Sequence, residues 1–209
     1  MQNETASKET SRLEAFSDGV FAIAITLLIL ELIQVLKTDD GSGLTKLLFH
    51  HWHSMLAYLI GFLTILICWI NHHLVFNYIQ KSDSLLMWIN GLVLFVVTFT
   101  PFPTAILAEY LEKDSHTAVF IYGCNYLLMS IAAYGISAYT YHKHFIPESK
   151  RKEYYAFVKL YKYSIIFTFL NLIVCMISVP VSLGLYFILF IVFAFPREFS
   201  VWLIRAKNK

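Results

Sequence analysis

Charged side chains are scarce in this sequence. Lys, Arg, Asp and Glu make up only 14% of its 209 residues, whereas soluble domains carry about 25%. Hydrophobic residues reach 58%, and the mean hydropathy is +0.62. The few charges gather in short clusters between long apolar runs. This arrangement excludes a soluble globular domain, because such surfaces need lipid as their solvent, and it predicts an all-α membrane protein.

Cysteine and the common catalytic motifs are also rare or missing. The three cysteines, Cys68, Cys124 and Cys175, are far apart and lie inside apolar runs. They form neither a disulfide framework nor a CxxC zinc motif. The sequence contains no GxSxG, Walker A or HExxH pattern, so nothing indicates a nucleophile, a nucleotide site or a metal site. We therefore expect no enzyme activity, no cofactor and no bound metal.

Long apolar runs dominate what is present. A helix needs roughly 20 mainly apolar residues to cross a bilayer, and six stretches meet this length. They predict one six-helix transmembrane domain over residues 1–209, without an internal repeat. The expected helices are approximately 12–36, 47–78, 84–110, 116–142, 153–179 and 181–204. The limits of the sixth are the least defined, because Pro196 can either kink the helix or end it.

The distribution of basic residues predicts the orientation in the membrane. With six spans and a cytoplasmic N-terminus, every one of the 16 lysines and arginines lies inside except Lys37, Lys46 and Lys113. This asymmetry follows the positive-inside rule, so both termini are expected in the cytoplasm. The basic stretch 150–152 is expected to fix topology and meet anionic lipid. It gives no support for nucleic-acid binding.

The first apolar segment carries unusual polar residues at its start. Ser11 and Glu14 have the spacing of a capping box, which predicts a helix start there. Ser17 and Asp18 then fall at the beginning of the apolar run. A carboxylate near hydrocarbon costs a few kcal/mol unless it finds partners. Arg12 lies about 120° from Asp18 around a helix, so we expect the partners of Asp18 on neighbouring helices.

Candidate partners lie at the inner end of the second segment and the start of the third. If the second helix runs inward, they reach the depth of Ser17 and Asp18. We therefore predict a buried polar network at the cytoplasmic end of the bundle, which either serves conduction or only locks helices together. The candidate residues are Trp69, Asn71, His72, His73, Asn77 and Asn90.

The pattern Arg12-x-x-x-Phe16-Ser17-Asp18, opening the first of six spans, resembles the signature of the transmembrane protein 175 potassium channel family. The resemblance extends over the whole chain, since prokaryotic members are single six-helix repeats of this length. It implies a homotetramer whose first helices line one central pore that potassium ions cross. It also implies a constriction of apolar side chains instead of a TVGYG filter, which this sequence lacks. Carried onto this chain, the constriction consists of Ile23, Leu27 and Leu30.

Helical geometry is compatible with that constriction. At 100° per residue, Ile23, Leu27 and Leu30 lie at about 0°, 40° and −20°, in one narrow stripe, whereas Asp18 lies about 140° away. Residues 19–30 are apolar all round apart from Thr26, so periodicity alone does not select this stripe. Without the resemblance the three side chains would be assigned to lipid contact or packing. Further candidates for the pore lining are Thr26, Val20, Gln34 and Glu31, and Phe16 falls on the same side.

Two other classes of function remain open at this stage. A proton-coupled secondary transporter would use Asp18 and the histidines, and would require a discontinuous helix near the midplane. A non-conducting membrane scaffold would require neither. The favoured interpretation is a channel in the cytoplasmic membrane of a prokaryote that passes potassium in moderate preference to sodium.

Overall fold

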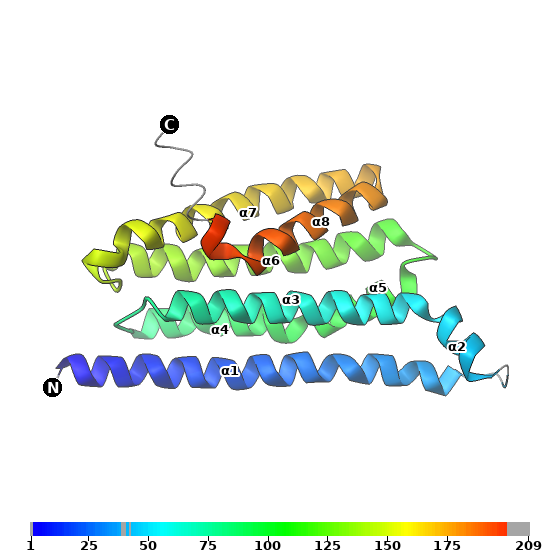
Figure 1. Cartoon of the computed structure of the whole chain (residues 1–209), viewed down its shortest axis with the longest axis horizontal. Coiled ribbons are helices and arrows are strands. Elements are labelled where there is room, and N and C mark those ends of the chain that lie inside the picture. The colour runs from blue at the N-terminus through cyan, green and yellow to red at the C-terminus, as the bar shows by residue number, and fades with distance from the viewer. Residues whose placement is uncertain (1, 39–40, 42, 200–209) are drawn as a thin grey trace.

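A computed structural model describes residues 2–38, 41 and 43–199. Long helices run side by side along one axis, with α1 (Gln2–Val35) at one edge of the bundle (Figure 1). The helices α3 (Trp52–Phe76) and α4 (Ser84–Phe99) pack directly on α1. Beyond them lie α6 (Ser115–His142), α7 (Arg151–Ile177) and α8 (Val179–Ala194). Shorter elements complete the described chain: η1 (Leu36–Thr38), α2 (Leu44–His50), α5 (Pro101–Tyr110) and η2 (Glu148–Lys150).

Five helical stretches of the described chain are long and apolar enough to cross a bilayer: Glu9–Val35, Trp52–Phe76, Ser84–Tyr110, Ser115–His142 and Glu148–Ile177. The helix α8 is apolar but has only 16 residues. At 1.5 Å per residue it spans about 24 Å, which is less than the roughly 30 Å of a hydrocarbon core. The architecture is thus an all-α membrane bundle.

The first helix begins earlier than its polar residues indicate. It starts at Gln2, so Ser11 and Glu14 lie within the helix and the predicted capping box is wrong. The 34 residues of α1 extend for about 51 Å, which is longer than the hydrocarbon core. Its polar N-terminal part therefore projects beyond the apolar layer.

Two of the expected helices are interrupted. The stretch expected at 47–78 is divided at His51, whose φ of −100° and ψ of 28° leave the helical region, so α2 and α3 are separate. The stretch expected at 84–110 is divided at Thr100, where α5 begins with Pro101. Proline has no N–H and removes a helical hydrogen bond at this point. Thr100 keeps helical angles, so the chain continues in nearly the same direction.

The sixth helix is shorter than expected. It ends at Ala194, and Phe195 breaks it before the helical residues 196–199. Pro196 directly follows the break, as expected for a residue that disfavours helical angles in its predecessor. The remainder of the predicted range, residues 200–204, lies outside the described residues.

Close packing holds α3 against its neighbours. A Cβ at Gly61 would come within 2.8 Å of Thr104 Oγ1 and 3.3 Å of Leu28 Cδ2, so only glycine permits this approach of α3 to α5 and α1. The buried face of α1 includes Phe21, Ala24 and Leu28, each at most 2% exposed. This packing fixes which side of α1 is turned toward its own subunit.

Candidate functional site

A buried polar network surrounds Ser17, where the apolar part of α1 begins. Ser17 is fully buried and donates its hydroxyl hydrogen to the Leu13 carbonyl at 2.8 Å. Its oxygen accepts a hydrogen bond from Asn90 Nδ2 on α4 at 2.9 Å. Asn90 Oδ1 lies 2.8 Å from His72 Nε2 on α3. One amide therefore joins the first, third and fourth helices.

Aromatic packing fixes the His72 ring in this network. The ring stacks on Phe76 with centroids 4.3 Å apart and lies 5.3 Å from Phe21 of α1. Asn90 uses its amide hydrogen toward Ser17, so its Oδ1 acts as the acceptor and His72 Nε2 carries the hydrogen. The imidazole is thus held as a donor to α4.

A second set of contacts ties α1 to α3 nearer the surface. Trp69 Nε1 donates to Asp18 Oδ1 at 2.8 Å. His73 Nδ1 lies 2.9 Å from Glu14 Oε1, and the Trp69 and His73 rings stack with centroids 5.9 Å apart. In each pair of positions, 14 with 18 and 69 with 73, the side chains are one helical turn apart. Because α1 and α3 are antiparallel, position 18 faces position 69 and position 14 faces position 73.

Two of the expected partners lie elsewhere. Asn71 faces away from α1, with Nδ2 donating to the Phe193 carbonyl at 2.7 Å and Oδ1 accepting from Tyr161 at 3.0 Å. Its predicted role beside Asp18 is wrong, because it lies about 200° from Trp69 around α3. Asn77 caps the end of α3 and is exposed. The signature residues Arg12 and Phe16 are also exposed on α1 and are not buried with Ser17.

The opposite side of α1 is apolar and uncovered within the single chain. Ile23, Leu27 and Leu30 are 60%, 45% and 50% exposed. Thr26, Glu31 and Gln34 are exposed as well, and Val20 is half-buried. The Thr26 hydroxyl lies 3.0 Å from the Ala22 carbonyl and 2.9 Å from the Ile23 carbonyl. Its hydrogen is thus bonded within the helix, while the oxygen keeps its acceptor lone pairs.

These features show what α1 can do in an assembly. One side is fixed to α3 and α4 by buried hydrogen bonds, and the other presents an apolar edge that the rest of its own chain leaves open. We call the residues Ile23, Leu27 and Leu30 the apolar edge. An edge of this kind either contacts lipid or meets other subunits. In the described residues, no group of three or more His, Cys, Asp or Glu side chains is arranged to hold a metal ion.

The chain is similar to several known channel proteins. Residues 12–101 match the family model described as endosomal/lysosomal potassium channel TMEM175. A potassium channel of Chamaesiphon minutus is 40% identical over 190 residues, which are 89% of this chain and 94% of that protein. The crystal structure of a lysosomal potassium-selective channel TMEM175 homolog from the same organism matches with a TM-score of 0.80 at 39% identity, covering 91% of this chain and 98% of that one.

Two further relatives match shorter stretches of the chain. A potassium channel of Streptomyces collinus is 52% identical over 126 residues, which are 59% of this chain and 61% of that protein. The chicken endosomal/lysosomal proton channel TMEM175 is 36% identical over 124 residues, and this stretch covers only 24% of that longer protein. The relatives are thus named for two different cations.

Proposed function

Because the chain belongs to the TMEM175 family of cation channels, we propose that it conducts potassium in preference to sodium through a central pore lined by α1 of four identical subunits. It is a multi-pass membrane protein and not an enzyme. In this proposal potassium is the permeant ion, and its conduction requires no cofactor. The observation that carries it is the apolar edge of α1, which its own subunit leaves open.

The position of the apolar edge supports a shared axis. A helix that lines a pore between subunits must be anchored on one side and uncovered on the other. The described part of α1 has this division, because Ser17, Phe21 and Leu28 are buried while Ile23, Leu27 and Leu30 are 45–60% exposed. Four such edges around one axis would enclose a narrow apolar passage.

The chemistry of that passage would set both selectivity and gating. Hydrocarbon side chains give a cation no substitute for its hydration water, so an ion passes only by shedding part of that water. Potassium holds its water less tightly than sodium and should pass more readily. Hydrophobic constrictions also gate channels by dewetting, so the same residues would close the pore.

The neighbouring positions would line the wider parts of the pore. Thr26 offers hydroxyl lone pairs beside the constriction. Val20 and Gln34 would lie on the pore side before and after the constriction, and Glu31 would attract cations near its outer end. The contacts of Ser17 and Asp18 with α3 and α4 would hold α1 at the tilt that sets the width of the constriction.

The orientation in the membrane also belongs to the proposal. The N-terminus, the α3–α4 connection and the α6–α7 connection lie at one end of the bundle (Figure 1). This end carries Lys81, Lys143 and Arg151. By the positive-inside rule it would face the cytoplasm, with the protein in the cytoplasmic membrane.

The experiment that tests the function is a reversal potential measured with purified protein in a bilayer, with potassium on one side and sodium on the other. A potassium-selective channel gives a potential displaced toward the potassium equilibrium value. Leu27→Ala and Ile23→Ala should widen the passage and reduce that displacement. Ile29→Ala is the matched control, because Ile29 is also exposed (38%) but lies about 120° from Ile23.

The alternatives make different predictions in the same system. A proton-coupled transporter would move potassium only with a linked proton flux, and a scaffold would move neither. Equal reversal potentials for the wild type, Leu27→Ala and Ile29→Ala would remove the apolar edge from the selectivity mechanism.

A further inference from the structure

The helix α7 presents one continuous stripe of side chains on the outside of the bundle. At 100° per residue, all members of this stripe lie within about 60° of Lys159 around the helix. Each of them is exposed or half-buried. The α7 stripe consists of Lys152, Tyr155, Lys159, Lys162, Tyr163, Ile166, Leu170, Ile173 and Ile177.

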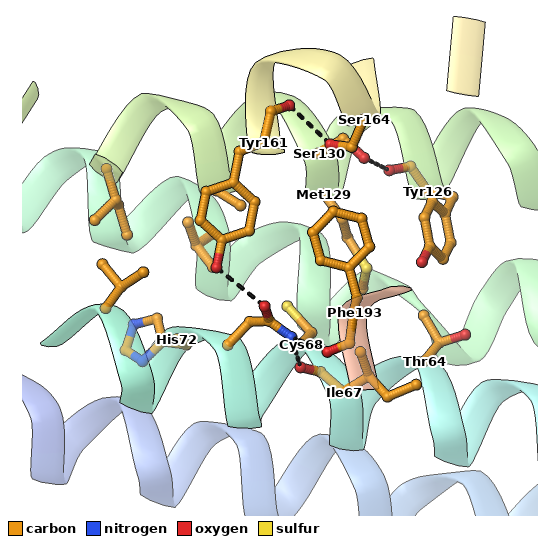
Figure 2. A pocket seen from close by; sticks show the side chains of 15 residues that line it. Thr64, Ile67, Cys68, His72, Tyr126, Met129, Ser130, Tyr161, Ser164 and Phe193 are labelled. Carbon is orange, nitrogen blue, oxygen red and sulfur yellow. Dashed lines mark hydrogen bonds between the residues drawn. The ribbon is translucent and has the colours of Figure 1, made fainter. Parts of the chain in front are cut away.

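The opposite side of α7 is packed inside the subunit. Tyr161 and Ser164 point from α7 into the bundle (Figure 2), and both residues are buried. The Tyr161 hydroxyl donates to Asn71 Oδ1 of α3 at 3.0 Å. Since α7 also lies at the edge of the bundle opposite α1 (Figure 1), the α7 stripe is remote from the proposed pore.

The α7 stripe changes its chemistry along the helix. The part from Ile166 to Ile177 contains only aliphatic side chains, which are 50–78% exposed. The part from Lys152 to Tyr163 contains three lysines and two tyrosines. Lysine and tyrosine beside apolar side chains are typical of a helix that passes from hydrocarbon into the headgroup layer.

The depth of the lysines agrees with this transition. His116 Nδ1 of α6 lies 2.9 Å from the Cys175 carbonyl, so polar groups mark the end of the bundle at the last turn of α7. Counted back along the helix from Cys175, Lys159 lies at about 24 Å and Lys152 at about 35 Å. The two lysines therefore bracket the far edge of a hydrocarbon core about 30 Å thick. Lys162 lies one turn deeper than Lys159 and reaches the same edge by extending toward water.

The charges of these lysines are not neutralised within the subunit. Of the basic stretch 150–152, the first two residues pair with Glu153 and Glu148, each at 3.8 Å, and only Lys152 belongs to the α7 stripe. In the part of the chain that the structure describes, none of the three lysines of the stripe has a carboxylate within 4.0 Å. Three such charges beside an aliphatic surface favour an anionic ligand that also carries hydrocarbon.

Aromatic contacts order the centre of the α7 stripe. Lys159 Nζ lies 4.6 Å from the Tyr155 ring centroid, and Tyr155 stacks on Tyr141 of α6 with centroids 5.1 Å apart. The Arg151 guanidinium lies 4.4 Å from the Tyr141 centroid. The two rings thus join two cations into one row across α6 and α7. Side chains that are already ordered lose less conformational entropy when a ligand binds.

We propose that the α7 stripe binds an anionic phospholipid. Its phosphate group would contact Lys152, Lys159 and Lys162, and an acyl chain would lie along the aliphatic part of the stripe. By the positive-inside rule, the lipid belongs to the cytoplasmic leaflet. The proposal does not depend on ion conduction, because it rests on α7 and its contacts alone.

Native mass spectrometry of the full chain in detergent tests this binding with two added lipids. Phosphatidylglycerol is anionic and phosphatidylcholine is zwitterionic, and both are used with the same acyl chains in equal amounts. The wild type should retain phosphatidylglycerol in preference. One lysine near an anionic surface contributes about fivefold to binding, so Lys159→Gln should reduce the preference by about this factor. The triple variant Lys152→Gln/Lys159→Gln/Lys162→Gln should abolish it.

A second triple variant separates the α7 stripe from the general charge of the protein. Lys81→Gln/Lys143→Gln/Lys150→Gln removes three charges from the same end of the bundle but outside the stripe, and it should keep most of the preference. Equal loss in the two triple variants would assign the preference to net charge and overturn the proposal. Equal retention of both lipids by the wild type would overturn it whether or not any variant folds.

Competition distinguishes a lipid from a soluble phosphate compound. Glycerol 3-phosphate carries the phosphate charge without acyl chains, so at the same concentration it should leave phosphatidylglycerol bound to the wild type. Displacement of the lipid would show that the aliphatic part of the stripe does not contribute, and the surface would then be a site for soluble phosphates instead of phospholipid.

Discussion

Asn90 of α4 donates its side-chain amide to Ser17 of α1 across 2.9 Å, and both residues are at most 1% exposed. The same Asn90 accepts from His72 of α3. In an apolar bundle no water can take over this hydrogen bond if the two side chains separate. The bond therefore fixes the depth and rotation of α1 relative to α4. The rotation in turn decides which edge of α1 remains open.

Asn90→Ala should destabilise the protein strongly. The substitution leaves the His72 Nε2–H without its acceptor, and an unpaired buried polar group costs about 1–3 kcal/mol. Thermal unfolding in detergent measures the loss. Asn77→Ala is the control, because Asn77 is exposed at the end of α3 and should change stability by no more than about 0.5 kcal/mol. Equal melting temperatures for the two variants would contradict the role of Asn90.

Asp18→Asn should weaken folding or assembly rather than act on the ion directly. The amide oxygen can still accept from Trp69 Nε1, but a hydrogen bond to a charged group is about 1 kcal/mol stronger than one between neutral groups. Trp69→Phe should also lower the stability. The double variant should lose less stability than the sum of the losses in the two single variants. Size-exclusion chromatography measures the assembly of each variant, and thermal unfolding measures its stability. If Asp18→Asn assembles normally and alters only permeation, Asp18 belongs to the ion path.

Asp83 should make the start of α4 sensitive to acid. It caps α4 by accepting from the Leu86 N–H at 2.8 Å, and it also accepts from the Tyr139 hydroxyl at 2.5 Å. Burial alone would raise the pKa of Asp83, but these hydrogen bonds and the charge of Lys143 outweigh it, so the pKa lies below its ordinary value of 3.8. A lowered pKa stabilises the fold above the ordinary value, and this contribution disappears as the pH falls through the folded-state pKa.

The measurement for Asp83 is a comparison of unfolding at about pH 5 and about pH 3. Asp83→Asn keeps a capping side chain but does not titrate, so the wild type should lose more stability than this variant over the interval. Asp83→Ala should lose about 1 kcal/mol at neutral pH through the missing cap. Identical acid losses in the wild type and Asp83→Asn would show that Asp83 does not contribute.

The membrane bundle could be predicted from the sequence because long apolar runs have few other solutions. Pro101 is a sequence signal for the interruption at Thr100, although the predicted helix 84–110 continues through it. The break at His51 carries no glycine or proline signal. It depends on how α2 and α3 pack, which a single sequence does not encode locally.

The candidate site was predictable where helical rotation alone decides the contact. Trp69 and His73 are about 40° apart and share the face toward α1, as their contacts with Asp18 and Glu14 require. Asn71 is close to Trp69 in sequence, but helical rotation places it on the far side of α3, with Tyr161. The link from Asn90 to Ser17 depends on the relative depth of two helices, so it was expected only as one candidate among several.

The most direct test of the apolar edge is a block by cadmium in a background where Cys68, Cys124 and Cys175 are alanine. In the proposed tetramer, Leu27→Cys would place four thiolates around one axis, and thiolates bind soft metal ions tightly. The account predicts that cadmium blocks potassium flux through Leu27→Cys, that a chelator restores it, and that Ile29→Cys, exposed on another side of α1, is unaffected. Block of Ile29→Cys with a Leu27→Cys channel that still conducts would contradict it.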